Sequence, residues 1–403
     1  MAEAPSKTAW LTIVGLGEDG PDGLPPASRR ALDQAEVVMG AKRHLALLPG
    51  LKADTVEWPV PFADGLPILR GYRGRPVVVL ASGDPFWFGA GAVIARDLDA
   101  CEWRALPGPS TFSLAAARLG WPLERTLCLG LHAAPLTRLR PHLAPGLRAI
   151  VLLRDGEAVP ALAAYLRDEG FGDTRMTVME ALGGQLERIT VLTAETPPGD
   201  AFAHPVAVAL EVEGDGLCLP VASGIDDGFF DTDGQITKRP VRALALSALA
   251  PRPYETLWDI GGGSGTIAIE WLLSHPTTEA VSIELRADRA DRIRANADRL
   301  AVDRLRVIEG QAPGALEGFA APQAVFIGGG LSDALLTDLT ERLPPGTRLV
   351  AHAVTLESEG LLAAWSERLG GSLLRIELSE AGALGARRGW KAAYPVVQWR
   401  VVL

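Results

Sequence analysis

The sequence has few cysteines, no long apolar run and no excess of basic residues, and each of these features excludes a class of protein. Its three cysteines, Cys101, Cys128 and Cys218, form no C-x-x-C pair, which excludes a recognisable disulfide framework or zinc site. No apolar stretch approaches the roughly 18 residues that a membrane helix needs. The formal net charge of −10 argues against nucleic acid as a substrate, because phosphate binding relies on a basic field. We therefore expect a soluble protein of the reducing cytoplasm, with no bound metal and no membrane or nucleic-acid partner.

The length and composition predict two domains with substantial cores. The chain has 403 residues, of which 48% are hydrophobic and 22% charged, and it is too long for one ordinary domain. A stretch rich in glycine and aspartate covers residues 213–234 and is interrupted by a brief apolar run at 217–222. Stretches of this composition mark domain boundaries. We place the boundary near residue 222, which predicts domains at 1–222 and 223–403.

A glycine-rich turn between a strand and a helix is the most informative stretch. Residues 257–260 are typical of an apolar strand, residues 261–265 are glycine apart from Ser264, and residues 266–273 are typical of an apolar helix. Glycine lets the backbone approach a ligand closely, and the helix start offers free N–H groups. The spacing is G-x-G-x-G and not the G-x-G-x-x-G of pyrophosphate sites, and Glu284, which ends the next apolar run, suits a ribose diol. The stretch favours S-adenosylmethionine over NAD, and a tight turn without a ligand is the alternative.

The first half contains three strand-to-turn units of an α/β fold. Apolar strands at residues 10–14 and 76–81 open into turns at 15–20 and 82–85, and a third turn at 107–111 precedes a short helix. Continuous β-branched runs of this kind indicate buried parallel strands. Further strands that complete a second α/β lobe are predicted at 149–153, 176–179 and 206–210.

Four motifs of this half resemble those of the tetrapyrrole (corrin/porphyrin) methylases. They lie, in the order of that family, at residues 14–17, 82–85, 107–111 and 180–188, and the resemblance covers residues 9 to 215. It implies two α/β subdomains that hold S-adenosylmethionine in a cleft. From the residues alone, the aspartate of the G-D-P turn could instead cap that turn, and the Ser-Thr pair could cap a helix. The family also includes methylases of protein and ribosomal RNA, so this half leaves the substrate open. The implied cofactor contacts are Gly83, Asp84, Pro85, Ser110 and Thr111.

Motifs at residues 236–238, 259–265, 309–313, 327–330 and 353–357 resemble those of the class I methyltransferase fold, and more closely those of the small C-terminal methylase of cobalamin biosynthesis. Strands and helices alternate from residue 257 to residue 369, which predicts a parallel, doubly wound, Rossmann-like sheet. Two final strands at 373–378 and 396–402 imply an antiparallel strand at one edge. Gln311 stands where the family has an acidic residue, although its amide oxygen can still accept from an adenine amino group. By this resemblance the cofactor contacts are Thr237, Asp259, Gly261, Gly263, Gly265, Glu284, Gln311 and Ala312.

The combination of both modules resembles the fused methylases of cobalamin biosynthesis. That resemblance implies one S-adenosylmethionine per domain and a precorrin, a small-molecule tetrapyrrole, as substrate. It also implies methylation of C5 by the first domain, methylation of C15 by the second, and loss of carbon dioxide from the ring C acetate. We further expect a homo-oligomer. The alternatives are a methylase of RNA or protein, and a scaffold that binds S-adenosylmethionine without turnover.

Polycarboxylate substrates call for cations near the cleft, and decarboxylation calls for a proton donor. A precorrin's carboxylates would be bound by some of the basic residues of the second half, although loop cations are usually solvated surface. His352, at the end of strand 348–351, is the first candidate for the donor, with Glu357 or Tyr394 as alternatives. His352 could equally form a hydrogen bond to a neighbouring loop. The substrate-binding candidates are Lys238, Arg242, Arg387 and Arg388, with Arg239 and Lys391 beside them.

Overall fold

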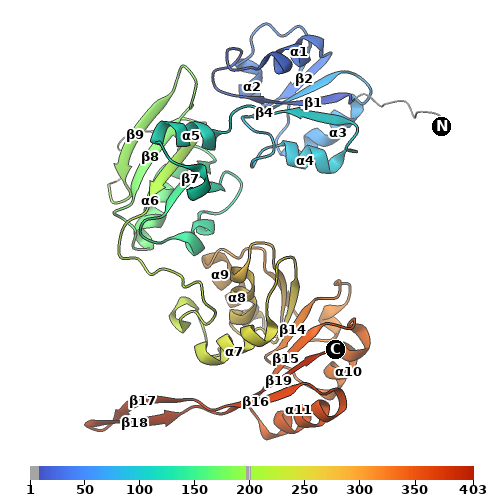
Figure 1. Ribbon diagram of the computed structural model, residues 1–403, viewed down its shortest axis with the longest axis vertical. Helices are drawn as coiled ribbons and strands as arrows, with labels where there is room; N and C mark the ends of the chain where they lie inside the picture. Colours follow the sequence, from blue (N-terminus) through green and yellow to red (C-terminus); the bar gives the residue numbers. More distant parts are fainter. Residues whose placement is uncertain (1–8, 197–198, 200) are drawn as a thin grey trace, which may run out of the picture. The chain divides into compact units, whose positions relative to one another are not determined.

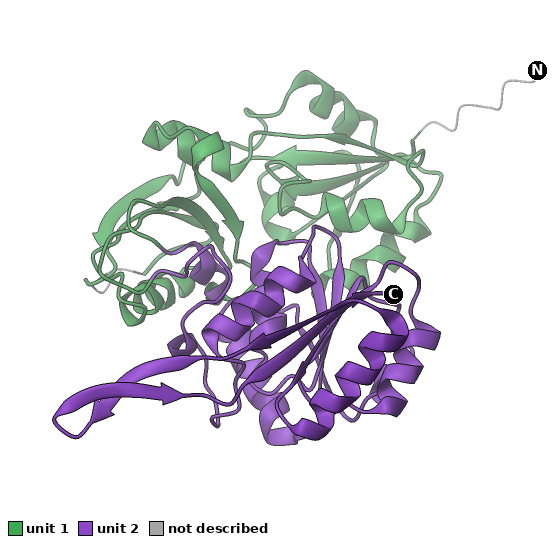
Figure 2. Cartoon of the chain, turned by 60° about the horizontal axis from the view of Figure 1, so that its bottom comes forward, with its two compact units in different colours: residues 1–136, 144–217 green, residues 137–143, 218–403 purple. Residues whose placement is uncertain are grey.

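The computed structural model describes residues 9–196, 199 and 201–403, and the chain divides into two compact units. Unit 1 runs to Leu136 and resumes over Ala144–Leu217, whereas unit 2 combines Thr137–Leu143 with Cys218–Leu403 (Figure 2). Among the described residues, none of the helices is both long enough and apolar enough to cross a membrane. The functional division at residue 222 stays a prediction.

The first sheet of unit 1 is parallel, with the strand order β3-β2-β4-β1-β5 (Figure 1). Alternate residues of its central strands enter the cores on opposite faces, because successive side chains of a strand point to opposite sides. Leu11 and Ile13 pack in one core, and Val14 and Leu16 in the other. The strands are β1 (Leu11–Leu16), β2 (Val37–Gly40), β3 (Asp54–Glu57), β4 (Val77–Ser82) and β5 (Trp103–Leu106), and the helices are α1 (Pro26–Gln34), α2 (Lys42–Ala46), α3 (Gly65–Gly71) and α4 (Gly91–Asp97).

The second sheet of unit 1 is mixed, with the order β6-β7-β10-β8-β9. The β6–β7 pair is parallel and the other pairs are antiparallel. The three strands predicted for this lobe are present. The strands are β6 (Leu127–Gly130), β7 (Arg148–Leu153), β8 (Arg175–Glu180), β9 (Arg188–Thr193) and β10 (Val206–Glu211), and the helices are α5 (Thr111–Leu119) and α6 (Ala158–Asp168).

Unit 2 contains a seven-stranded sheet with the order β13-β12-β11-β14-β15-β19-β16. The first five strands of that order are parallel, as predicted, but the antiparallel strand β19 lies inside the edge and is covered by β16. The strands are β11 (Thr256–Ile260), β12 (Glu279–Glu284), β13 (Arg306–Glu309), β14 (Ala324–Ile327), β15 (Arg348–Ala353), β16 (Ser372–Ile376) and β19 (Val396–Val402). The helices are α7 (Arg239–Leu249), α8 (Thr266–Ser274), α9 (Ala287–Arg299), α10 (Asp333–Arg342) and α11 (Leu356–Leu369).

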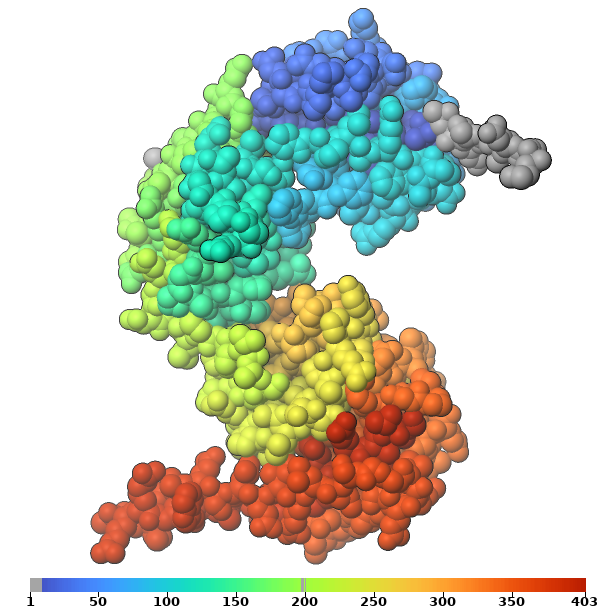
Figure 3. All heavy atoms as spheres, viewed as in Figure 1, coloured from blue at the N-terminus to red at the C-terminus, as the bar shows by residue number. Residues whose placement is uncertain are grey.

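A two-stranded ribbon extends from unit 2 between β16 and β19. It consists of β17 (Ser379–Leu384) and β18 (Arg387–Ala392), which pair only with each other (Figures 1 and 3). Its tip carries Arg387 and Arg388, and Trp390 is 79% exposed. The sequence analysis did not predict this ribbon.

A short segment of the first half of the sequence belongs to unit 2. Leu139 and Leu143 are fully buried there. Arg138 forms an ion pair with Asp303 at 3.0 Å, and the guanidinium of Arg140 lies 5.5 Å from the centre of the Phe229 ring. A cut at residue 222 would therefore separate this segment from the rest of unit 2.

Candidate active sites

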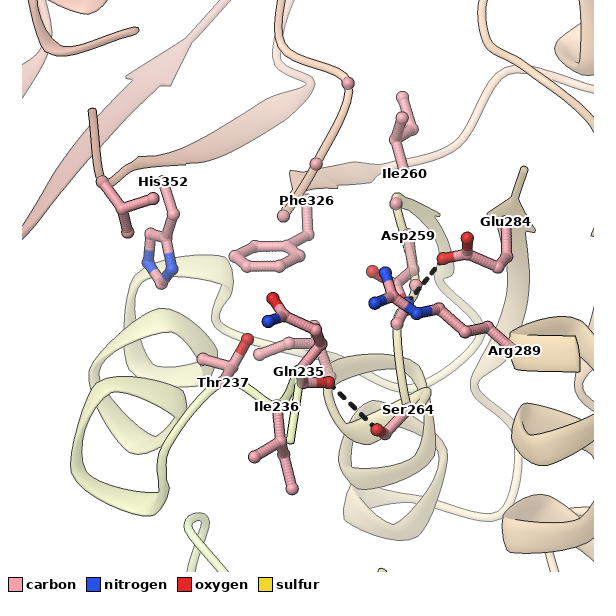
Figure 4. Close-up of a pocket in the computed structure, with 18 of the residues that line it drawn as sticks. Gln235, Ile236, Thr237, Asp259, Ile260, Ser264, Glu284, Arg289, Phe326 and His352 are labelled. Carbon is pink, nitrogen blue, oxygen red and sulfur yellow. Dashed lines mark hydrogen bonds between the residues drawn. The ribbon is translucent and has the colours of Figure 1, made fainter. Parts of the chain in front are cut away.

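The glycine turn of unit 2 borders a cavity of about 530 Å³ at the carboxyl ends of the parallel strands (Figure 4). Parallel α/β sheets bind ligands at this edge. Each of the strands β11, β12, β13 and β14 contributes the residues that follow it, and β15 contributes His352. Residues 235–238, which precede α7, form a further wall. The turn therefore borders a space that can admit a ligand, and ligand binding at the turn stays a prediction.

Glycine is required at the start of this turn for two physical reasons. Gly261 has a φ of +72°, a conformation that side chains disfavour. A Cβ atom on Gly261 would also lie 2.5 Å from the backbone nitrogen of Gly329, in the loop after β14. Gly263 has a φ of +60°, but a Cβ there would meet only the carbonyl oxygen of Gln235, at 3.4 Å. Gly265 is the N-cap of α8 and does not line the cavity.

Glu284 holds the turn in place and also lines the cavity. Its Oε2 accepts a hydrogen bond from the backbone N–H of Gly263 at 2.8 Å, and its Oε1 accepts one from the N–H of Arg286 at 3.1 Å. A carboxylate has about four acceptor positions, so both oxygens can accept further hydrogen bonds. Glu284 can therefore fix the backbone and bind a pair of ligand hydroxyl groups together.

Asp259 is a buried carboxyl group at the floor of the cavity. The hydroxyl of Ser282 donates to its Oδ2 at 3.2 Å, and the side chain is 1% exposed. Burial raises the pKa of Asp259 to about 7, and the charge of Glu284 acts in the same direction, whereas the Ser282 hydrogen bond opposes the change. The group is therefore poised between its neutral and charged forms near neutral pH.

Asp259→Asn is expected to remove a pH-dependent part of the stability. A carboxyl group whose native pKa lies above its unfolded value binds its proton more tightly in the native state, so stability falls as pH rises from about 4 to about 7. The amide has no such proton. The free energy of unfolding of the variant, relative to that of the wild type, should therefore increase by roughly 1–3 kcal/mol when the pH is raised from 5 to 8. Urea unfolding at both pH values measures this difference, with the exposed Asp298→Asn as control. A difference that is independent of pH would contradict the shifted pKa.

His352 lies in the cavity wall, paired with the antiparallel strand. Its Nε2 is 3.0 Å from Oε1 of Gln398, and its ring stands edge-on to Phe326, with ring centroids 4.9 Å apart (Figure 4). An amide oxygen only accepts, so this assignment places the ring proton on Nε2. Burial lowers the pKa of His352, and the Gln398 hydrogen bond opposes this. The neutral ring can therefore accept a proton. It can transfer a proton to a substrate only after it has accepted one.

The cavity of unit 2 brings together most of the predicted site residues. Glu357 does not line it, and Arg387 and Arg388 lie on the ribbon. Tyr394 lines the cavity but is 88% exposed. The predicted residues that line it are Thr237, Lys238, Asp259, Gly261, Gly263, Glu284, Gln311, Ala312, His352 and Tyr394.

The surroundings of Arg242 do not fit the predicted role in substrate binding. Its side chain is fully buried, and its guanidinium donates to Glu270, to Asp227 at 2.9 Å, and to the carbonyl oxygens of Ile225 and Thr237. These contacts occupy the guanidinium, which leaves Arg242 no role at a substrate's carboxylates. Arg242 instead ties residues 225–237 to helices α7 and α8, and so supports one wall of the cavity.

Unit 1 contains its own cavity, of about 680 Å³, bordered by the turns after β1, β4 and β5. The side chains that could cap local structure do so: Ser110 Oγ accepts from Ser113 N at 3.1 Å, and Asp84 Oδ1 accepts from Phe86 N at 2.9 Å. Ser110 and Asp84 therefore both cap local structure and line the cavity. Gly83, Asp84, Ser110 and Thr111 line the cavity, whereas Pro85 is buried outside it.

Two family models match the chain, one in each half. The model described as Tetrapyrrole (Corrin/Porphyrin) Methylases matches residues 10–198, and that described as Precorrin methyltransferase domain matches residues 228–403. A precorrin-6Y C(5,15)-methyltransferase (decarboxylating) from Sinorhizobium sp is 49% identical over 396 residues, which cover 97% of this chain and 95% of that protein. The chain belongs to the precorrin-6Y C5,15-methyltransferase family. The predicted α/β fold, a tetrapyrrole-methylase domain followed by a class I methyltransferase domain, is confirmed.

Other relatives match only one half of this chain, and their names mention only one of the two halves or positions. A cobalt-precorrin-7 C(5)-methyltransferase of Salmonella typhimurium is 27% identical over 49% of this chain and 98% of its own length. A cobalt-precorrin-6B C(15)-methyltransferase (decarboxylating) of the same organism is 32% identical over 40% of this chain and 85% of its own length. A crystal structure of the C-terminal domain of precorrin-6Y C5,15-methyltransferase from Rhodobacter capsulatus is 50% identical, with a TM-score of 0.45, over 46% of this chain and 100% of that chain. The names of the two Salmonella proteins give C5 and C15 separately, whereas the name of the Sinorhizobium relative gives both positions.

The sequence analysis missed several cavity residues of this methyltransferase, among them Gln235, Arg289 and Phe326. Arg289 and Phe326 line the cavity of unit 2, and the carbonyl of Gln235 accepts from Ser264 Oγ at 3.1 Å (Figure 4). Phe326 lies in a strand that was predicted, but its apolar run does not reveal which of its side chains reaches the cavity. Nothing in the sequence marks Arg289, which the structure pairs with Asp233 at 2.9 Å.

Proposed function

We propose that the chain methylates C5 and C15 of a precorrin and releases carbon dioxide from the ring C acetate in cobalamin biosynthesis. C5 methylation is assigned to unit 1, and C15 methylation with decarboxylation to unit 2. The observation that carries the proposal is the presence of two separate cavities, each bordered by glycine-containing turns at the carboxyl ends of parallel strands. The proposal is supported by the relative from Sinorhizobium sp, which is 49% identical over 97% of this chain and whose name gives both the C5 and the C15 position.

The residues of unit 2 fit S-adenosylmethionine, which supplies an electrophilic methyl group when bound. The glycine turn admits a ligand close to the backbone. Glu284 has acceptor positions left for ribose hydroxyls, and Gln311 can accept from an adenine amino group. Ile283 and Ala312 offer apolar contacts beside them.

We propose that each unit binds one cofactor. In unit 1 the cofactor contacts would be Gly83, Asp84, Ser110 and Thr111, which line one cavity. The cytoplasmic location, the assembly as a homo-oligomer and the absence of a nucleic-acid partner are also proposals. An acidic chain supports the last of these, since RNA binding would require a basic field.

The carboxylates of the substrate would meet cations at the rim of the cavity of unit 2. Lys238, Arg286 and Arg289 line it, and Lys238 is only loosely paired, with 3.9 Å between its Nζ and Asp227. Cations hold carboxylates through charge-assisted hydrogen bonds. We also propose substrate contacts for Arg387 and Arg388, which lie on the ribbon and do not line the cavity.

His352 is proposed to carry the proton that decarboxylation consumes. Methylation at C15 releases a proton, whereas loss of carbon dioxide from an acetate carboxylate leaves a carbon that must gain one. Neutral His352 can accept the first proton and deliver the second, because Gln398 holds its ring at the cavity wall.

His352→Ala should lower carbon dioxide release about 10²–10⁴-fold, the usual contribution of a proton-transfer residue, with cofactor binding retained. The wild-type chain should give a product with two added methyl groups and one carbon dioxide lost, measured by mass spectrometry. Glu357→Ala and Tyr394→Phe test the alternative donors. Unchanged release of carbon dioxide by His352→Ala would remove this residue from the mechanism.

A chain that binds S-adenosylmethionine but forms no S-adenosylhomocysteine from a precorrin would be a scaffold.

A further inference from the structure

A cluster of polar side chains beside the predicted cofactor residues of unit 1 has no role so far. It consists of Arg43, His44 and Ser82, with Glu18 behind them, and all four line the cavity. Arg43 and His44 lie on α2, which follows β2, whereas Ser82 ends β4 and Glu18 follows β1. Strands β2, β4 and β1 are neighbours in the parallel sheet, so their carboxyl ends bring these residues together.

Three atoms of the cluster form a triangle of hydrogen-bond distances. Ser82 Oγ lies 2.9 Å from His44 Nε2, and Arg43 Nη2 lies 3.0 Å from each of them. A guanidinium has no acceptor, so Arg43 must donate to both atoms. His44 Nε2 therefore carries the lone pair, and the remaining bond of the triangle is made by the Ser82 hydroxyl donating to Nε2.

The electrostatics keep His44 neutral. Burial, the charge of Arg43 and the nearby His204 together lower the pKa of His44 to about 4, and an interaction with the backbone of Leu80 opposes this. Glu18 forms an ion pair with Arg43, so the guanidinium is itself compensated. The imidazole is therefore a free base over the physiological pH range. It is ready to accept a proton and cannot retain one for long.

We propose that Ser82 and His44 form the proton-accepting pair for methylation in unit 1, an inference that rests on the proposed function. The C5 carbon forms a bond to the methyl group, the bond between that methyl and sulfur breaks, and its electron pair remains on sulfur. The substrate ring is left with a positive charge and a hydrogen on C5. The C5–H bond then breaks and its electrons return to the ring. The proton passes to Ser82 Oγ while the Ser82 proton passes to His44 Nε2.

A weak base is sufficient for this step, because a C–H bond next to a delocalised cation is strongly acidic. The imidazolium beside Arg43 is unstable and gives its proton to water when the product leaves. Ser82 is thereby the catalytic residue and touches the substrate. His44 acts through Ser82, and Arg43 orients both.

The test uses the full chain with S-adenosylmethionine and a precorrin, and compares His44→Gln and Ser82→Ala with the wild type. Glutamine keeps a polar acceptor in the buried position but takes up no proton. We expect both variants to bind cofactor as the wild type does and to methylate C5 about 10²–10⁴-fold more slowly. A product with one added methyl and one carbon dioxide lost should accumulate. With substrate deuterated at C5, the isotope effect of His44→Gln should exceed that of the wild type.

The control is Lys42→Gln, which removes an exposed charge from the same helix and should leave the rate unchanged. C5 methylation at the wild-type rate by His44→Gln would overturn the inference. Loss of cofactor binding together with methylation would also overturn it, because the cluster would then only shape the turn. If the wild-type chain adds no methyl group at C5, the proposed function itself fails, and this role fails with it.

Discussion

Gly261→Ala is expected to abolish methylation and carbon dioxide release in unit 2 while unit 1 still methylates C5. The methyl side chain would have to occupy a φ of +72° and would lie 2.5 Å from the backbone of Gly329. The substitution would strain the backbone by about 1–3 kcal/mol. It would also displace the loop after β14, which forms another wall of the same cavity. We expect the cofactor affinity of unit 2 to fall by about a hundred-fold or more, since about 2.8 kcal/mol corresponds to that factor.

Calorimetric titration with S-adenosylmethionine measures this result. The wild type should bind two cofactors per chain and Gly261→Ala one, with C5 methylation unchanged in the product spectrum. Gly263→Val should act in the same way, in this case mainly through its φ of +60°. Asp84→Ala should have the reverse effect, on unit 1. Gly314→Ala is the matched control, because a Cβ there meets nothing within 4 Å. Loss of both methylations in a folded Gly261→Ala variant would refute independent sites.

Glu270→Ala should cause the largest loss of stability in unit 2. Glu270 is almost fully buried, pairs with the buried guanidinium of Arg242, and accepts from the backbone N–H groups of Gly224 and Ile225. Its removal leaves a buried charge without its main partner, a change that costs about 3–5 kcal/mol. The free energy of unfolding, measured in urea through the buried tryptophans of unit 2, should fall by this amount.

The same variant should weaken cofactor binding in unit 2, because Arg242 also holds the carbonyl of Thr237 in the cavity wall. Asp291→Ala breaks the exposed ion pair with Arg294 and is the control. Exposed pairs contribute little, so its unfolding transition should be close to that of the wild type. Equal effects of the two substitutions would show that the buried pair does not hold this segment.

Local sequence predicted the elements around the glycine turn of unit 2 and the parallel, doubly wound character of its sheet. The apolar runs at 257–260 and 280–284, and the glycines between them, act within a few residues, so their conformation follows from propensity and turn chemistry. Short-range sequence patterns of the same kind predicted the turns after β1 and β4 in unit 1. Whether these residues bind a cofactor remains a prediction, although the structure places most of them in the two cavities.

Tertiary structure alone decided which side chains meet across the sheet. Arg242 and Arg388 are both basic residues in the sequence, but one is buried against Glu270 and the other lies on a ribbon that pairs only with itself. Arg43, His44 and Ser82 are separated by up to 39 residues, and no local pattern joins them. They meet because the order of parallel strands brings distant loop ends to one edge. The sequence by itself determined the strands of the parallel part of unit 2, the glycine-containing turns and the family. Long-range strand pairing decided the side-chain contacts, since burial and pairing depend on residues far apart in the chain.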